Sequence, residues 1–229
     1  MTPERFRRIQ SVLNQRQPDL TVITDEVHKG RNIAAVVRTC DAVGIDTIHT
    51  VTPSAGYQRY QGTAMGSQKW VEVKEYDQIQ EPVQALKSQG FQILVAHLSE
   101  TAVDYRQIDY TSPTGIILGT EKQGVSESAA ILADQHITVP MMGMVASLNV
   151  SVACAIILTE ACRQRQQAGL YDQRRLPEVL YRQRLFCWCH PQLADYCHQH
   201  ALAYPLMNDQ GDIIDGPGWY QQARAQLQK

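Results

Sequence analysis

Three segments of the chain concentrate side chains that can bind an anion or orient a proton. Residues 28–38 open with His-Lys-Gly-Arg-Asn and continue into small and apolar residues next to Arg38. Residues 119–124 read Gly-Thr-Glu-Lys-Gln-Gly and hold Glu121 between two glycines. Residues 140–151 are a methionine-rich run that ends in Ser-Leu-Asn-Val-Ser. Because a guanidinium stays protonated in proteins, an arginine among apolar neighbours requires an anion, which is either a bound phosphate or a carboxylate of the protein itself.

The same segments lack the sequences of several common catalytic sites. The run 119–124 does not end in Gly-Lys-Ser or Gly-Lys-Thr, which disfavours a phosphate-binding loop of the nucleotide-hydrolysing kind. No Gly-x-Gly-x-x-Gly follows the first predicted strand, which disfavours an ordinary dinucleotide-binding fold. No serine stands in Gly-x-Ser-x-Gly, and no His/Glu pair has the spacing of a zinc protease.

Alternating strands and helices position the three segments. Apolar, β-branched runs predict strands at 20–27, 46–51, 71–76, 91–96, 114–118 and 136–140. Helical spacing predicts helices at 3–16, 33–43, 78–88, 126–133 and 150–166, with Asn32 as an N-cap and a loop at 52–68. This pattern indicates an α/β fold, a mostly parallel sheet with helices on both faces. Each segment follows a strand, and ligands of such sheets bind outside the carboxyl ends of the strands.

The three segments also carry motifs in a fixed order. They read N-x(5)-R-T-x-D-A-x-G at 32–44, I-I-L-G-x-E-x-x-G at 116–124 and V-P-M-x-G-M-V-x-S-L-N-V-S-V-A at 139–153. Together they resemble the SpoU family of RNA ribose 2′-O-methyltransferases, which belongs to the trefoil-knotted SPOUT class. The resemblance implies a C-terminal trefoil knot, S-adenosyl-L-methionine as methyl donor and a homodimer.

The sequence around these motifs narrows the expected substrate. The run RQPDLTV after the first helix and R-Q-R-Q-Q-A-G-L-Y at 163–171 resemble the branch of the family that methylates guanosine 18 in the D-loop of tRNA. Methylation of another tRNA nucleotide or of ribosomal RNA is an alternative, and so is a non-catalytic RNA-binding protein with the same fold.

The resemblance implies roles for individual residues. The expected catalytic residues are Arg38, Asn32, Glu121, Ser147 and Asn149, and the expected cofactor-binding residues are Ala96, Gly119, Val139, Met141 and Leu148. We expect Arg38 to lower the pKa of the ribose 2′-hydroxyl and to hold a phosphate, rather than to act as a base. The alternatives are an ion pair with Asp41 for Arg38, a helix cap for Asn32 and an exposed turn position for Glu121.

Positive charge is concentrated in two segments that flank an acidic middle. The net charge is +2 over residues 1–31, −6 over 32–162, +4 over 163–184 and −2 over 185–229. The expected contacts to tRNA phosphates are Arg5, Arg7, Arg8, Arg16, Arg163, Arg165, Arg174 and Arg175. Solvated helix surfaces are the alternative interpretation of this charge. The long helix at 150–166 has apolar residues on more than one side, which fits burial against a partner subunit.

Composition sets the remaining limits. The chain has 229 residues, 44% of them hydrophobic, and no apolar run of membrane-spanning length, so we expect no membrane partner. The resemblance implies a reaction at a ribose 2′-hydroxyl, which DNA lacks, so we expect no DNA partner. A charged N-terminal segment and six cysteines predict reduced thiols and a cytoplasmic location. The Cys/His cluster at 187–200 lacks the spacing of a common zinc finger, so no metal is expected. The expected domains are a basic helical arm at 1–19, the methyltransferase core at 20–168 and a basic linker with a helical appendage at 169–229.

Overall fold

The computed structural model describes residues 1–52, 69–121, 123–145 and 147–227. Residues 53–68, which make up nearly all of the loop predicted at 52–68, lie outside the described residues. The chain divides into two compact units, Arg16–Gln173 and a terminal unit of Met1–Gln15 with Arg174–Lys229. The first helix therefore belongs to the same unit as the C-terminal helices.

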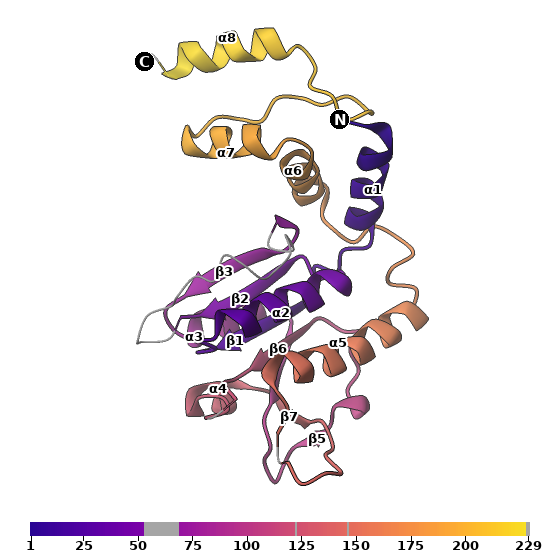
Figure 1. Ribbon diagram of the computed structural model, residues 1–229, viewed down its shortest axis with the longest axis vertical. Coiled ribbons are helices and arrows are strands. Elements are labelled where there is room, and N and C mark those ends of the chain that lie inside the picture. The colour runs from indigo at the N-terminus through magenta and orange to yellow at the C-terminus, as the bar shows by residue number, and fades with distance from the viewer. Residues whose placement is uncertain (53–68, 122, 146, 228–229) are drawn as a thin grey trace. The chain divides into compact units, whose positions relative to one another are not determined.

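The larger unit is built on a seven-stranded sheet with the order β3-β2-β1-β6-β4-β7-β5 (Figure 1). The strands are β1 (Leu20–Asp25), β2 (Thr47–Val51), β3 (Glu72–Tyr76), β4 (Gln92–Ala96), β5 (Val103–Asp104), β6 (Thr114–Leu118) and β7 (Gln135–Thr138). Each pairing is parallel, for example Val22 with Ile116 and Leu94 with Ile116. The parallel sheet is confirmed, and the short edge strand β5 is an addition that the sequence pattern did not reveal.

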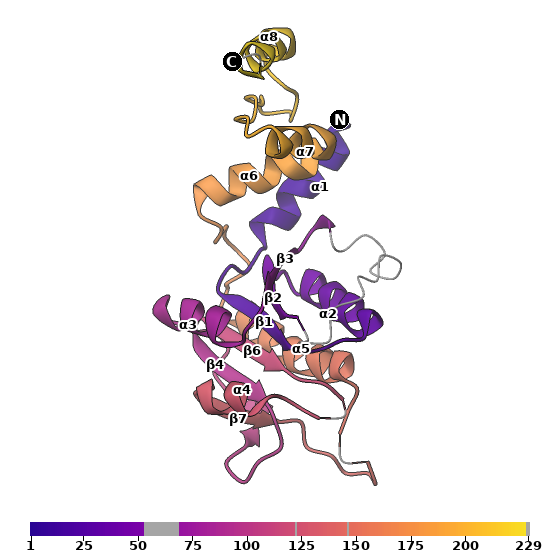
Figure 2. The same ribbon diagram turned by 90° about the vertical axis from the view of Figure 1, so that its left-hand side faces the viewer.

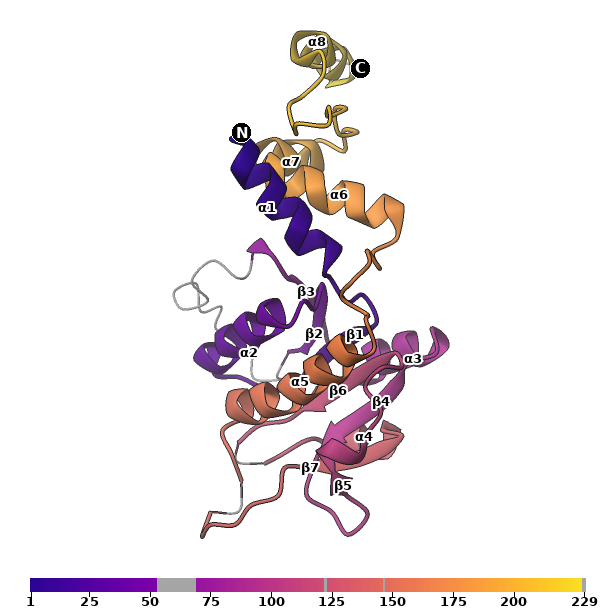
Figure 3. The same ribbon diagram turned by 90° about the vertical axis from the view of Figure 1, so that its right-hand side faces the viewer.

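Helices cover both faces of this sheet, as predicted (Figures 2 and 3). Helices α2 (Gly30–Ala42) and α5 (Val150–Gln167) pack over one face, and α3 (Gln80–Ser88) and α4 (Glu127–Leu132) pack over the other. Successive strand residues point to opposite faces, so Val22 joins the core under α2 and α5 while Ile23 joins the core under α3 and α4. This two-sided burial is the reason why every residue of β1 and of β6 is buried.

The terminal unit is helical. It contains α1 (Pro3–Asn14), α6 (Glu178–Cys189), α7 (Pro191–Gln199) and α8 (Gly216–Leu227), and α1 packs against α6. Thr2 caps α1 by accepting from the backbone N–H of Arg5, and Phe6, Ile9 and Leu13 form its buried side. No helix among the described residues is both long and apolar enough to cross a membrane.

Helices α2 and α5 each begin inside one of the three segments that carry the motifs. Helix α2 begins at Gly30 after Lys29, so Asn32 lies in its first turn and the predicted N-cap at Asn32 is wrong. The apolar periodicity starts only at Ile33, and this hid the first turn. Asn149 is the N-cap of α5, and its side chain accepts a hydrogen bond from the backbone N–H of Ser151.

Candidate active site

A cavity of about 370 Å³ lies at the carboxyl ends of β4, β6 and β7. Its lining includes all five residues predicted to bind the cofactor, which are Ala96, Gly119, Val139, Met141 and Leu148. The inner wall is apolar and includes Leu118 and Ile157, whereas the rim carries Thr120, Glu121 and Ser147. A small-molecule site of this size and mixed lining accepts a flat heterocycle and orients it through a few polar groups.

A tight turn after β6 forms one rim of this cavity. The backbone of Thr120 and that of Gly124 exchange two hydrogen bonds, of 2.7 and 3.0 Å. A Cβ on Gly119 would stand 2.1 Å from the carbonyl oxygen of Gly124, and Gly124 itself has a φ of +70°. Both positions therefore require glycine, and the turn that they allow presents Glu121 at its tip.

The same turn is tied to the end of β1. The buried carboxylate of Asp25 accepts a 2.6 Å hydrogen bond from the backbone N–H of Ser126, which is the N-cap of α4. Since β1 leads directly to the segment 28–32, this bond fixes the first and second chemical segments relative to one another. Asp25 was not among the predicted site residues, because a carboxylate at a strand end gives no separate signal in the sequence.

Glu121 gathers polar side chains from all three segments. Its Oε1 accepts from Asn32 Nδ2 at 3.2 Å and from Asn149 Nδ2, and its Oε2 pairs with Lys29 Nζ. Asn149 Nδ2 also donates to Asn32 Oδ1, at 3.2 Å. Hydrogen bonding to Lys29, followed by that to Asn32, lowers the pKa of the Glu121 carboxyl. Glu121 is therefore ionised, and its carboxylate connects side chains of the three segments.

Ser151 connects the cluster around Glu121 to a groove between α2 and α5. Its hydroxyl donates to Asn149 Oδ1 at 2.6 Å, and its side chain also lines a groove of about 670 Å³ between α2 and α5. Arg38 and Arg31 line the same groove, and both are exposed. Asp41, the ion-pair partner in the alternative interpretation of Arg38, accepts a 2.6 Å hydrogen bond from Arg16 through its Oδ1.

The structure brings the five residues expected to bind the cofactor to one cavity and divides the expected catalytic residues among three places. Asn32, Glu121 and Asn149 meet in one cluster, Ser147 lies on the cavity rim, and Arg38 lies in the neighbouring groove. Lys29 was missed although it stands in the same His-Lys-Gly-Arg-Asn run. The only feature of the sequence that could have indicated a role for Lys29 is its position just before the motif at 32–44.

Two of the predicted phosphate-binding arginines are buried, and this corrects their assignment. Arg16 donates to the carbonyl oxygens of Ile45 and Trp70 and to Asp41, and its side chain has no exposed surface. Arg165 is likewise fully buried and pairs with Asp19 at 2.7 Å. A guanidinium that already holds carbonyls and a carboxylate inside the core does not reach a phosphate. Both arginines have a structural role in the larger unit.

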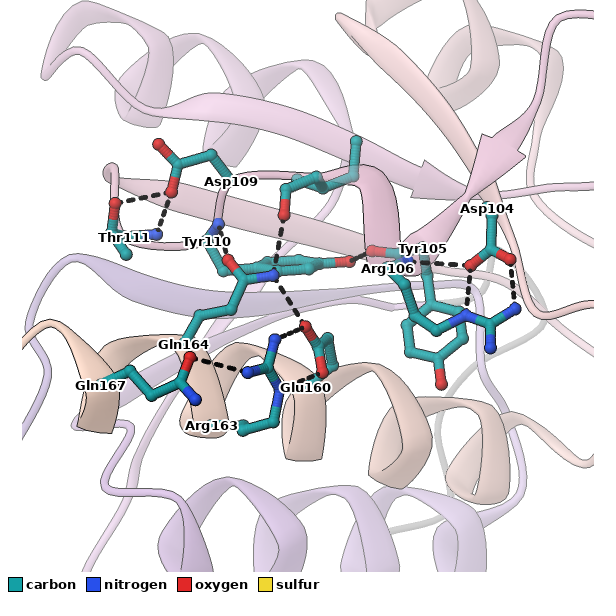
Figure 4. Close-up of polar contacts among 11 residues, drawn as sticks. Asp104, Tyr105, Arg106, Asp109, Tyr110, Thr111, Glu160, Arg163, Gln164 and Gln167 are labelled. Carbon is teal, nitrogen blue, oxygen red and sulfur yellow. Dashed lines mark hydrogen bonds and ion pairs between the residues drawn. The ribbon is translucent and has the colours of Figure 1, made fainter.

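The other predicted phosphate contacts are at or near the surface. Arg5, Arg7 and Arg8 are exposed on α1, and Arg174 stacks on the ring of Tyr181, 4.3 Å from its centroid, while Arg175 is half-buried. Figure 4 shows Arg163 paired with Glu160 on α5 and bonded to Gln167, with Gln164 bridging to the segment at Ile108 and Tyr110. The hydrogen bonds from Arg163 lower the pKa of Glu160 to about 2.

The Cys/His cluster of the terminal unit makes ordinary polar contacts. Cys187 Sγ lies 3.3 Å from the hydroxyl of Tyr204, which also contacts His198, and His190 Nε2 donates to the carbonyl oxygen of Gly211 at 2.8 Å. The six cysteines of the chain are free thiols. Among the described residues, no three His, Cys, Asp or Glu side chains are grouped as metal ligands would be.

A parallel α/β sheet with a cavity at its carboxyl end and an Asn-Glu-Asn cluster on the rim agrees with the family that the motifs indicated. The model of the SpoU rRNA methylase family matches residues 19–159, and that of the SpoU rRNA methylase C-terminal region matches residues 163–216. The chain belongs to the SpoU methylase family.

Particular relatives are similar over most of the chain. The tRNA (guanosine(18)-2′-O)-methyltransferase of Escherichia coli (strain K12) is 48% identical over 96% of this chain and 97% of its own length. The crystal structure of the A. aeolicus TrmH/SpoU tRNA modifying enzyme is 41% identical and has a TM-score of 0.76, over 81% of this chain and 94% of that one. An AdoMet-bound rRNA methyltransferase from Sinorhizobium meliloti is 28% identical with a TM-score of 0.58, over 68% of this chain and 59% of that one.

Proposed function

We propose that this protein transfers a methyl group from S-adenosyl-L-methionine to the ribose 2′-hydroxyl of guanosine 18 in tRNA. The observation that carries the proposal is the juxtaposition of the cavity at the ends of β4, β6 and β7 with the cluster centred on Glu121. The similarity to the guanosine-18 methyltransferase of Escherichia coli supports the choice of substrate. The family resemblance carries with it a trefoil knot in the C-terminal part of the core.

The cavity fits the methyl donor. Its apolar inner wall suits an adenine ring, and its polar rim leads toward Asn149, where the reacting end has to lie. When bound, S-adenosylmethionine supplies a methyl group on a positively charged sulfur, which is already a reactive electrophile. The protein therefore has to provide orientation, exclusion of water and stabilisation of charge on the ribose oxygen.

In this proposal Arg38 stabilises charge, and the cluster around Glu121 orients the side chains near the reacting groups. Arg38, as a permanent cation, binds a phosphate of the RNA and stabilises negative charge that develops on the 2′-oxygen. Glu121 holds the amides of Asn32 and Asn149 in fixed orientations, and Ser151 extends the network into the groove that Arg38 lines. Ser147 contributes a hydroxyl at the rim. Deprotonation of the 2′-hydroxyl falls to a phosphate or a neighbouring group, because a guanidinium is no base.

The tRNA backbone binds to arginines at or near the surface in this proposal. Arg5, Arg7 and Arg8 form one set and Arg163, Arg174 and Arg175 the other. Contacts of this kind hold the substrate without reading its sequence, and their strength falls with salt. The 2′-hydroxyl itself distinguishes RNA from DNA.

The proposed assembly is a homodimer in the cytoplasm, with α5 at the interface. On this helix Val150 and Ile157 are buried in the core, whereas Val152 is 45% exposed and lines the groove together with Ile156. A helix that is apolar on the core side and again on the outer side fits burial against a second copy. Light scattering or analytical ultracentrifugation of the protein and of Val152→Glu tests the dimer.

Incubation of unmodified tRNA with methyl-labelled cofactor, followed by mapping of the methylated nucleotide, tests the activity. The expected product is tRNA methylated at the 2′-oxygen of guanosine 18 and at no other nucleotide. Replacement of that guanosine by 2′-deoxyguanosine provides the matched control and should abolish labelling. Label at another tRNA nucleotide or in ribosomal RNA would show that guanosine 18 is not the substrate. Cofactor binding without transfer to any RNA would favour a non-catalytic RNA-binding protein.

A further inference from the structure

One polar side chain of the cavity is unused by the mechanism above. His97 follows Ala96 directly at the end of β4 and lines the cavity. Its backbone N–H donates to the carbonyl oxygen of Ile137 at 3.1 Å, so the chain at this point is fixed between β4 and β7. Within the described residues its imidazole makes a ring contact with His136 and no hydrogen bond.

The contact with His136 sets the orientation of this ring. The two ring centroids are 5.6 Å apart, with 72° between the planes, which is an edge-to-face arrangement. His136 is itself held at both nitrogens. Its Nε2 lies 3.1 Å from the carbonyl oxygen of Ala130 and its Nδ1 lies 2.9 Å from the hydroxyl of Ser99. Since a carbonyl only accepts, Nε2 of His136 carries a hydrogen, and in the neutral ring Nδ1 accepts from Ser99.

The space next to His97 is kept open. Gly124 is the nearest part of the turn after β6, and a Cβ at that position would lie 3.9 Å from Nδ1 of His97. Since His97 and Gly124 both line the cavity, the Nδ1 side of the ring lies next to space that a ligand can occupy. An imidazole that lines the cavity and has no hydrogen-bonding partner among the described protein groups can form a hydrogen bond with a ligand there.

We propose that His97 is a binding residue for the adenosine half of the methyl donor, contributing a hydrogen bond from its preset imidazole. The assignment to this half follows from its neighbours, since His97 adjoins Ala96 and Ile137 in the apolar part of the lining. The catalytic cluster on the rim is centred on Glu121, at the tip of the turn. The inference rests on the proposed function, because it takes S-adenosylmethionine as the ligand of this cavity.

Calorimetric titration of the full chain with S-adenosylmethionine and with 5′-methylthioadenosine, which lacks the amino-acid part, tests the inference. His97→Phe preserves an aromatic ring against His136 and removes both nitrogens. We expect it to weaken both ligands by the same factor, about 3- to 10-fold for one neutral hydrogen bond. The KM for the cofactor should rise by that factor, while kcat at saturating cofactor and the Kd for tRNA stay unchanged. His200→Phe in the terminal unit is the matched control, and His97→Ala gives the loss without the ring.

The outcomes separate this inference from the proposed function. Wild-type protein that binds no S-adenosylmethionine would refute the proposed function. Wild-type protein that binds and methylates, together with His97→Phe of unchanged affinity, would overturn only the role of His97. Weakened binding of S-adenosylmethionine with unchanged binding of methylthioadenosine would also overturn it, because the contact would then lie on the amino-acid half. A melting curve without ligand shows whether the variant is folded.

Discussion

Replacing Arg165 with methionine distinguishes a structural arginine from a tRNA-binding one. The guanidinium of Arg165 is fully buried and donates to five acceptors within the larger unit. These are the carbonyl oxygens of Tyr110, Asp19 and Ser112, the side-chain oxygen of Gln17 and the carboxylate of Asp19, at 2.7 to 3.1 Å. Methionine fills much of the same volume and satisfies none of them.

The expected loss in the free energy of unfolding follows from the groups that Arg165→Met leaves without their partner. The Asp19 carboxylate is only 16% exposed, so removing its partner leaves a largely buried charge. Removing one partner of a buried ion pair typically costs about 3–5 kcal/mol. Leaving the Tyr110 carbonyl without its donor adds to this cost, whereas the carbonyls of Asp19 and Ser112 keep hydrogen bonds from Thr114. Partial entry of water reduces the cost, so we expect about 3–5 kcal/mol for Arg165→Met. Loss of this size is a large part of the stability of a typical domain.

The assay is unfolding in guanidinium chloride, read by circular dichroism, with tRNA binding measured on the fraction that stays folded. Arg163→Met is the matched control, because Arg163 lies on the same helix with its side chain 52% exposed and pairs with Glu160 at the surface. It should change the free energy of unfolding by less than about 1 kcal/mol. Wild-type stability for Arg165→Met, together with weakened tRNA binding, would refute the structural role and restore the phosphate-binding interpretation.

Three further results are expected. Arg38→Ala should abolish methyl transfer while the Kd for S-adenosylmethionine changes less than about 2-fold, because this arginine lies in the groove outside the cofactor cavity; near-normal turnover would rule out its role. Simultaneous Arg5→Gln, Arg7→Gln and Arg8→Gln should weaken tRNA binding and reduce the slope of log K against log salt by about 1 for each lost phosphate contact, with an unchanged slope counting against the basic helix. His49 is buried against Tyr76, and burial lowers its pKa from 6.5 to about 4. Between these two pH values the unfolded state therefore binds more protons than the folded state. The free energy of unfolding consequently falls as the pH drops from 6.5 to 4. His49→Phe should reduce that loss by up to about 3 kcal/mol at pH 4, and identical pH dependence of unfolding in the two proteins would contradict the argument.

Much of the core was predictable because its signals are local. The strand at 114–118 was placed to the residue, and the helix predicted at 150–166 agrees with α5 to one residue. Continuous apolar strands predicted a sheet covered on both faces, since each strand has to bury every side chain. Four of the five expected cofactor residues lie in the motifs and Ala96 lies at the end of a predicted strand, and the structure brings all five to one cavity. The strand order β3-β2-β1-β6-β4-β7-β5 was not, because pairing is decided by contacts between distant segments.

The sequence by itself determined which residue types are available at the strand ends and which segments are helical or extended. Only the tertiary structure decided which side chains meet. It brought Lys29, Asn32, Glu121 and Asn149 together, and it placed the positive charges of Arg16 and Arg165 inside the core rather than on an RNA-binding surface. An arginine in a basic segment has the same local sequence in either case. Its burial depends on acceptors such as Asp19 and the Tyr110 carbonyl, which lie far away in the chain and become neighbours only on folding.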